Sequence, residues 1–257
     1  MTRVARARLS ARTEGERGTS LAELLVAMMI FSVIVAVLAT LTVTFTRTNS
    51  QVMTRQDQVD TARVATEVMS KKLRTSVMPS QLTTTCTACT QDAFVLGQDF
   101  AVQFYANVNN SGNLVGPSRV TYTVTSTSAG VGTLVEKVQV PDSNVPTSSG
   151  YVYCNAEATG ASGVCKARLK TRILARGVQM KPGAALFSYY TYTGAPLLPS
   201  ASAGSLTTTT LAQVFSVELN VAVQAASGNK VKPTTYIQRV TLPNAQAVLR
   251  QNQEANS

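Results

Sequence analysis

The sequence predicts an α+β fold in which a long N-terminal helix, membrane-spanning in its first half, precedes an antiparallel β-sheet head. The 22 residues of 24–45 contain no Asp, Glu, Lys or Arg, and about 20 such residues cross a hydrocarbon core as a helix. No Gly or Pro interrupts residues 19–78. After Pro79 the sequence is rich in Thr, Val, Ser, Tyr and Gly, which is typical of strands and turns.

Residues 1–18 form a basic leader in front of the apolar stretch. Five arginines stand against two glutamates there, so this short segment carries +3 of the net charge of +10. Positive residues next to a membrane helix stay on the cytoplasmic side. We therefore expect a single-pass protein of the cytoplasmic membrane, with its N-terminus inside and residues 79–243 forming a head outside.

The predicted helix covers residues 19–78, with its transmembrane segment at 21–45. Beyond that segment, several apolar residues fall near one face at helical spacing, so the second half is predicted to be amphipathic. They are Val52, Val59, Ala62, Met69 and Leu73. Pro79 is expected to end the helix, because the residue before a proline avoids the helical region.

The head is predicted from short runs rich in β-branched and aromatic residues, separated by turn residues. The sequence "NVNNSGN" at 107–113 is read as a turn; a calcium loop would offer carboxylates where this stretch has asparagines. Residues 244–257 are expected to be a flexible tail. The predicted strands are 93–96, 101–107, 119–125, 132–140, 151–154, 165–174, 185–192, 212–223 and 234–242.

The stretch "ERGTSLAELLVAMMIFSVI" resembles the class III signal of type IV pilins and type II secretion pseudopilins. The resemblance implies that a membrane peptidase cuts after Gly18 and that Thr19 becomes the methylated N-terminus. Glu23 is then the glutamate at the fifth position of the mature chain. Thr19 departs from the large apolar residue, often Phe, that the family usually has there, and Ala22 replaces a larger aliphatic residue.

Glu23 is a single carboxylate at the start of an apolar run, and two interpretations account for it. In an assembled bundle of apolar helices an unpaired carboxylate is penalised, so Glu23 would select the register in which it meets a terminal amine. Alternatively, Ser20 and Glu23 match the S-x-x-E capping box of a helix start. For the whole N-terminal segment, the alternative to a cleaved signal is an uncleaved signal anchor.

All four cysteines follow the apolar segment, so on an exported head they are expected to form disulfides. The "CTAC" at 86–89 lies in a threonine-rich loop rather than at a helix start, which argues against a redox site. A zinc site without histidine would need all four thiolates, and the last two are too far apart for a usual knuckle. Of the three possible connectivities we favour the local pairs Cys86–Cys89 and Cys154–Cys165.

Alternating cations occur in "CKARLKTRILAR", at Lys166, Arg168, Lys170 and Arg172. On a strand, alternate residues share one face. One interpretation is a contact for an anionic partner, such as DNA or a charged cell surface. The other is a solvated strand face whose charges discourage edge pairing; few aromatic residues interleave with the cations, which favours this second interpretation.

The composition lacks the usual signatures of an enzyme. There is no histidine, which removes the commonest general base and metal ligand. Neither a phosphate-binding P-loop nor a G-x-S-x-G motif is present. We expect no catalysis, cofactor or metal; a membrane-anchored enzyme that is never cleaved is a distant alternative.

The head resembles, more weakly, the larger minor pilins and J-type pseudopilins, in "FAVQFYANVNNSGNLVGPSRVTYTV", "GTLVEKVQV" and "IQRVTLPN". The resemblance implies a subunit that initiates or caps a pilus or secretion pseudopilus. Its partners would be the prepilin peptidase and methylase, other pilins or pseudopilins, an inner-membrane assembly platform and a separate ATPase. The alternative is an adhesin or DNA-uptake receptor carried on such a fibre, with the four cations as its contact.

Overall fold

A computed structural model describes residues 20–82, 91–128, 130–181, 183–224 and 231–244. By internal contacts the chain forms two compact units, which divide between Ser50 and Gln51. The helix α1 (Leu21–Leu73) runs through this division. The predicted leader at 1–18 and all but the first residue of the predicted tail at 244–257 lie outside the described residues.

The first unit contains the apolar part of α1. Every residue from 20 to 50 is exposed, and the segment is long and apolar enough to cross a membrane. Its few hydroxyl groups are satisfied within the helix: Ser32, Thr40, Thr42 and Thr44 each donate a 2.8 Å hydrogen bond to a carbonyl three or four residues earlier. A helix in hydrocarbon needs such internal partners, since no water is available there.

In the second unit, α1 ends at Leu73, five residues before the predicted end at Met78. The chain leaves the helix early because it pairs with the sheet: the amide of Val77 donates to the carbonyl of Tyr105 at 3.0 Å. Pro79 instead begins a short 3-10 turn. A long-range backbone pairing, and not the proline, therefore sets the end of the helix.

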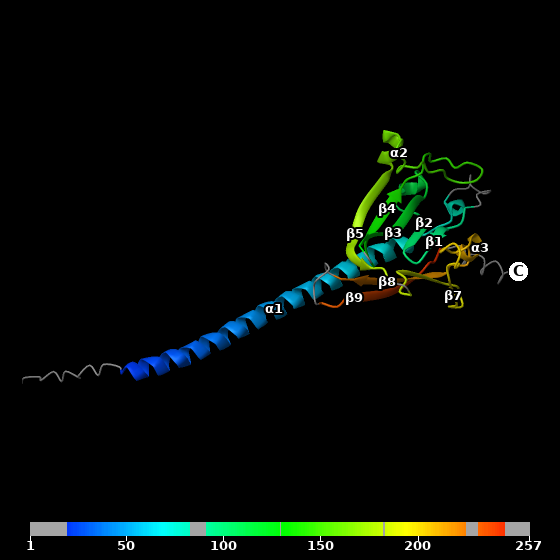
Figure 1. Ribbon diagram of the computed structural model, residues 1–257. Coiled ribbons are helices and arrows are strands. Elements are labelled where there is room, and N and C mark those ends of the chain that lie inside the picture. The colour runs from blue at the N-terminus through cyan, green and yellow to red at the C-terminus, as the bar shows by residue number, and fades with distance from the viewer. Residues whose placement is uncertain (1–19, 83–90, 129, 182, 225–230, 245–257) are drawn as a thin grey trace, which may run out of the picture. The chain divides into compact units, whose positions relative to one another are not determined.

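The described part of the second unit contains one nine-stranded sheet whose paired neighbours are all antiparallel (Figure 1). The order is β1-β2-β3-β4-β5-β8-β6-β7, with β9 on the other side of β8. The elements after α1 are η1 (Pro79–Gln81), β1 (Phe94–Gly97), β2 (Ala101–Ala106), η3 (Ser111–Asn113), β3 (Ser118–Ser128), β4 (Val131–Gln139), α2 (Gly163–Ala167), β5 (Leu169–Gln179), β6 (Phe187–Tyr190), β7 (Pro196–Leu197), α3 (Thr208–Leu211), β8 (Ser216–Val223) and β9 (Thr234–Thr241).

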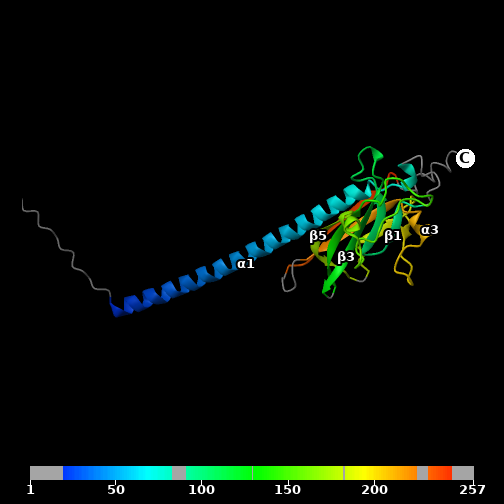
Figure 2. The ribbon, with the colours of Figure 1, turned by 90° about the horizontal axis from the view of Figure 1, so that it is seen from above.

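Strand β5 joins two halves of this sheet. It pairs with β4 along its whole length but meets β8 only at the pair Val178–Val223. Two register shifts interrupt the β4–β5 ladder and leave Leu174 and Gly177 as extra residues on β5. Such bulges bend a strand and increase its twist. Figures 1 and 2 show the resulting curl of the sheet within the head.

The inner face of the curled sheet packs on the last turns of α1. Of the predicted apolar face, Ala62, Met69 and Leu73 are fully buried, whereas Val52 and Val59 are exposed. The buried face of α1 consists of Gln58, Ala62, Ala65, Thr66, Met69, Ser70 and Leu73. The aromatic residues Phe104, Tyr122, Phe187 and Tyr189 lie in the same core.

Most predicted strands are present, with shifted ends. Residues 151–154 form no strand, because the backbone of Tyr151 pairs with the side chain of Gln91: its amide donates to Oε1 at 2.9 Å and its carbonyl accepts from Nε2 at 3.0 Å. The predicted strand at 165–174 begins as the helix α2. The predicted turn at 107–113 is confirmed, and the Asn110 carboxamide accepts hydrogen bonds from the amides of Val115 and Gly116, which follow it.

Candidate functional site

The start of α1 is closed by a reciprocal capping box. The Glu23 amide donates to the Ser20 hydroxyl at 3.2 Å, and the Ser20 amide donates to the Glu23 carboxylate at 3.1 Å. The local interpretation of Glu23 is therefore present in the structure. Gly18 and Thr19, the predicted cleavage site, lie outside the described residues.

The capping box leaves the second interpretation of Glu23 open to a direct test. Glutamine serves at this position of a capping box as well as glutamate does. The hydrogen bonds to Ser20 therefore need an acceptor but no negative charge. A role that depends on the charge of Glu23 has to come from a partner outside this box.

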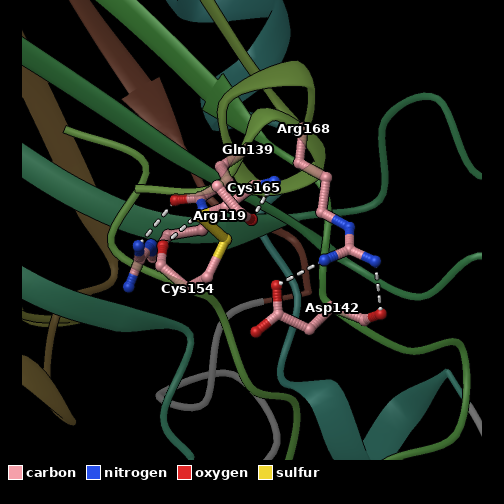
Figure 3. Close-up of polar contacts among 7 residues, drawn as sticks. Arg119, Gln139, Asp142, Cys154, Cys165 and Arg168 are labelled. Atoms are coloured by element: carbon pink, nitrogen blue, oxygen red, sulfur yellow. Dashed lines mark hydrogen bonds and ion pairs between the residues drawn. A yellow bond between two sulfur atoms is a disulfide. The ribbon is translucent and has the colours of Figure 1, made fainter. Parts of the chain in front are cut away.

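Cys154 and Cys165 form a disulfide, as predicted, with their Cα atoms 6.0 Å apart (Figure 3). The bond closes a loop that ends in α2, whose first turn is capped by the Ser162 hydroxyl accepting from the Cys165 amide at 3.2 Å. Cys86 and Cys89 lie outside the described residues. We call residues 154–165 the disulfide loop.

This disulfide should contribute about 3 kcal/mol to the free energy of unfolding, because it constrains a short loop in the unfolded chain. We expect the double variant Cys154→Ser/Cys165→Ser to lose that amount in urea denaturation followed by circular dichroism. The matched control is Cys86→Ser/Cys89→Ser: the predicted local pair would close a loop of only four residues, so its loss should cost less stability than the loss of Cys154–Cys165. A 154/165 double variant as stable as its parent would contradict this prediction.

The prediction that four alternating cations share one strand face is wrong for two of them. Lys166 belongs to α2, and Arg168 lies at its C-terminus, where its guanidinium contacts the Asp142 carboxylate at 3.1 Å (Figure 3). Only Lys170 and Arg172 lie on β5, at alternate positions. The helix forms because Ser162 caps it, and the strand starts only at Leu169.

Arg172 belongs to an ionic cluster around the buried Glu136, and this cluster joins α1 to the sheet. The residue Glu136 is 3 % exposed, and its carboxylate lies 2.8 Å from Lys72 Nζ and 3.0 Å from Arg172 Nη2. The Tyr122 hydroxyl donates to the same carboxylate at 2.9 Å. Burial, and then the negative charge of Glu136, raise the pKa of Tyr122. The cluster therefore links α1 to β4 and β5 and leaves Arg172 engaged within the protein.

The outer face of β2–β5 carries a polar cavity of about 110 Å³ beneath the disulfide loop. Its floor comes from alternate residues of neighbouring strands, which the register places side by side. Cations, amides, a hydroxyl and one carboxylate line it. The main polar lining residues are Gln103, Arg119, Thr121, Lys137, Asn155 and Glu157. We call this the loop cavity.

Gln139 and Tyr153 hold Arg119 at the edge of the loop cavity. A guanidinium nitrogen of Arg119 donates to Gln139 Oε1 at 2.7 Å, and Gln139 Nε2 donates to the carbonyl of Cys154 at 2.6 Å (Figure 3). The guanidinium also lies 4.8 Å from the centre of the Tyr153 ring. Burial raises the pKa of Tyr153, so its phenol stays neutral. The disulfide loop and the sheet thus position this cation together.

The second cation of the loop cavity is paired with the loop itself. Lys137 Nζ on β4 lies 2.6 Å from the Glu157 carboxylate. The side chain of Glu157 is 59 % exposed, so solvent reaches the pair.

The sequence analysis missed Arg119, Thr121, Lys137 and Gln139. Their alternation with buried apolar residues on two adjacent predicted strands was the available signal, but the covering loop was not predictable from it.

No family model, curated protein or solved structure matches this chain.

Proposed function

We propose that this chain is a minor pilin or pseudopilin: a subunit that waits in the cytoplasmic membrane and is then built into a pilus or secretion pseudopilus. The observation that carries the proposal is the coincidence of three features. A basic segment ends in Gly18, Glu23 follows at a fixed offset, and a charge-free helix begins immediately afterwards. The role inferred is assembly at the start or the tip of a fibre.

The apolar part of α1 supports the proposal. The exposed apolar surface of residues 24–45 needs either lipid or other apolar helices around it. At the centre of a bilayer, a carboxylate without a partner costs roughly 2.5–3.5 kcal/mol or more. Cleavage after Gly18 would create an amine at Thr19, four residues before Glu23 in the sequence. That amine, on the same or a neighbouring subunit, is the partner that the charge of Glu23 requires.

The first test is the mass of the N-terminus in membranes of the native host. We expect a chain that begins at Thr19 and carries an added methyl group. Gly18→Ala should impair processing less than Gly18→Phe, because the peptidase needs an extended backbone without a large side chain. A native protein that still carries residues 1–18 would refute the cleavage.

The second test separates the charge of Glu23 from its capping role. Glu23→Gln keeps an acceptor for the capping box, so the helix should form and processing should continue. We expect at least a tenfold loss of this chain from sheared fibres, because the amine no longer meets a carboxylate. Ser20→Ala removes the capping hydroxyl but keeps the charge, and it should retain assembly. If Glu23→Gln and its parent were incorporated into fibres equally, the result would contradict the proposal.

A further inference from the structure

We propose that the loop cavity binds a carboxylate-bearing sugar, such as the terminal sugar acid of an acidic glycan. The cavity lies on the outer face of the sheet, between β2–β5 and the disulfide loop. This inference does not depend on the cleavage after Gly18 or on assembly into a fibre. It rests on the charges, the amides and the size of the cavity.

Arg119 provides a cation that forms no ion pair with the residues that the structure describes. Among the ion pairs of the described residues, none involves Arg119. Its guanidinium is half-buried and fixed by Gln139 and by the Tyr153 ring. One hydrogen bond to Gln139 leaves further N–H groups of the guanidinium to donate. A guanidinium held in this way fits a carboxylate through two parallel hydrogen bonds.

Lys137 provides a second cation whose present partner is replaceable. Glu157 reaches Lys137 from the disulfide loop, and it is the only carboxylate among the residues that line the loop cavity. Because Glu157 is largely exposed, the pair contributes little to stability. A ligand carboxylate would compete with Glu157 for the same cation. The lining therefore carries two cations against one anion, and an incoming anion would balance it.

The remaining polar groups of the loop cavity are suited to binding the hydroxyl groups of a ligand. Gln103 Nε2 donates to the Thr121 hydroxyl at 2.7 Å, which leaves the carbonyl oxygen and one N–H of this amide. Asn155 Oδ1 accepts from the Glu157 amide at 3.2 Å, which leaves its NH₂ group. Amides and hydroxyls that both donate and accept are the natural partners of sugar hydroxyls. A simple carboxylate such as acetate would use none of them.

The size of the cavity limits the ligand. Pockets for drug-sized molecules occupy roughly 300–1,000 Å³, whereas the loop cavity is about 110 Å³. It therefore has room for a single terminal group with part of its ring exposed. For a ligand of that size, a dissociation constant on the order of 1 mM is expected.

The experiment is a ligand-detected NMR titration of the full chain in a detergent without a sugar headgroup. The probes are glucuronate, glucose and acetate. We expect saturable binding of glucuronate, with glucose and acetate each at least tenfold weaker. Equal binding of acetate would overturn the sugar assignment, and equal binding of glucose would overturn the role of the carboxylate.

Two substitutions are expected to change the affinity for glucuronate in opposite directions. Glu157→Gln removes the internal competitor and should tighten glucuronate binding about tenfold. Arg119→Gln should weaken it at least tenfold, because the ligand loses its charged partner. The matched control is Arg176→Gln, an exposed arginine on β5 that does not line the cavity.

Opposite signs for these two variants protect the test against misfolding, since a damaged cavity would not bind more tightly. If Glu157→Gln leaves glucuronate affinity unchanged or lowers it, the proposal is wrong. It is also wrong if Arg176→Gln weakens binding as much as Arg119→Gln does, because that would show attraction by net charge alone.

Discussion

Glu136→Gln is expected to lower the free energy of unfolding of the head by about 3 kcal/mol. The carboxylate is buried, and its negative charge balances Lys72 and Arg172, which approach it from α1 and from β5. Removing one member of a buried ion pair costs about 3–5 kcal/mol, because the remaining charge stays buried without compensation. We expect the lower end, since the Arg172 side chain is 55 % exposed and can turn to solvent.

Urea denaturation of the full chain in detergent micelles, followed by circular dichroism, measures this loss. The matched control is Glu67→Gln, because Glu67 forms an ion pair of the same length, 2.8 Å, with Lys71 on the surface of α1. That pair is exposed on both sides, so its loss should change stability by less than about 1 kcal/mol. Equal effects of the two substitutions would mean that Glu136 does not hold α1 to the sheet.

This cluster also shows where prediction from the sequence stops. The alternation in "GTLVEKVQV" places Glu136 on the same face as Leu134 and Val138, which are buried. A carboxylate at an inward position must find a cation, but its partner Lys72 lies 64 residues away. The pattern of residues within one strand does not indicate which residue far away in the sequence will be the partner. The strands were therefore predictable, whereas the contact that fixes them to α1 was not.

The same difference between local patterns and long-range contacts applies to the rest of the fold and to the sites. A charge-free run predicted the apolar part of α1, because a run of that length and composition is typical of a helix able to cross a membrane. The pair Cys154–Cys165 was predictable because the two residues are close in sequence. The early end of α1 depends on the pairing of Val77 with Tyr105, and the loop cavity depends on the disulfide loop covering the sheet; neither contact is local in sequence. The capping box was visible in the sequence, since both of its members lie within four residues.

Gly177→Ala is expected to have the largest effect on the head, a loss of more than about 4 kcal/mol, which is exceptional for one substitution. Gly177 is the extra residue of the second bulge of β5 and has φ +73°. A Cβ atom there would lie 2.1 Å from the carbonyl oxygen of Gln224. That oxygen cannot move away easily, because the Gln224 amide donates to the Gly177 carbonyl at 2.9 Å.

The variant Gly183→Ala separates the cost of the steric clash from the cost of the left-handed backbone conformation. Gly183 has φ +78°, but a Cβ atom there would meet nothing within 4 Å. It should therefore lose only the cost of a left-handed conformation, roughly 1–2 kcal/mol. The difference between the two variants, measured by the same denaturation, reports the contact at the junction of β5 and β8. If the two variants were equally destabilised, the close approach at Gly177 would add nothing to the cost of its backbone conformation.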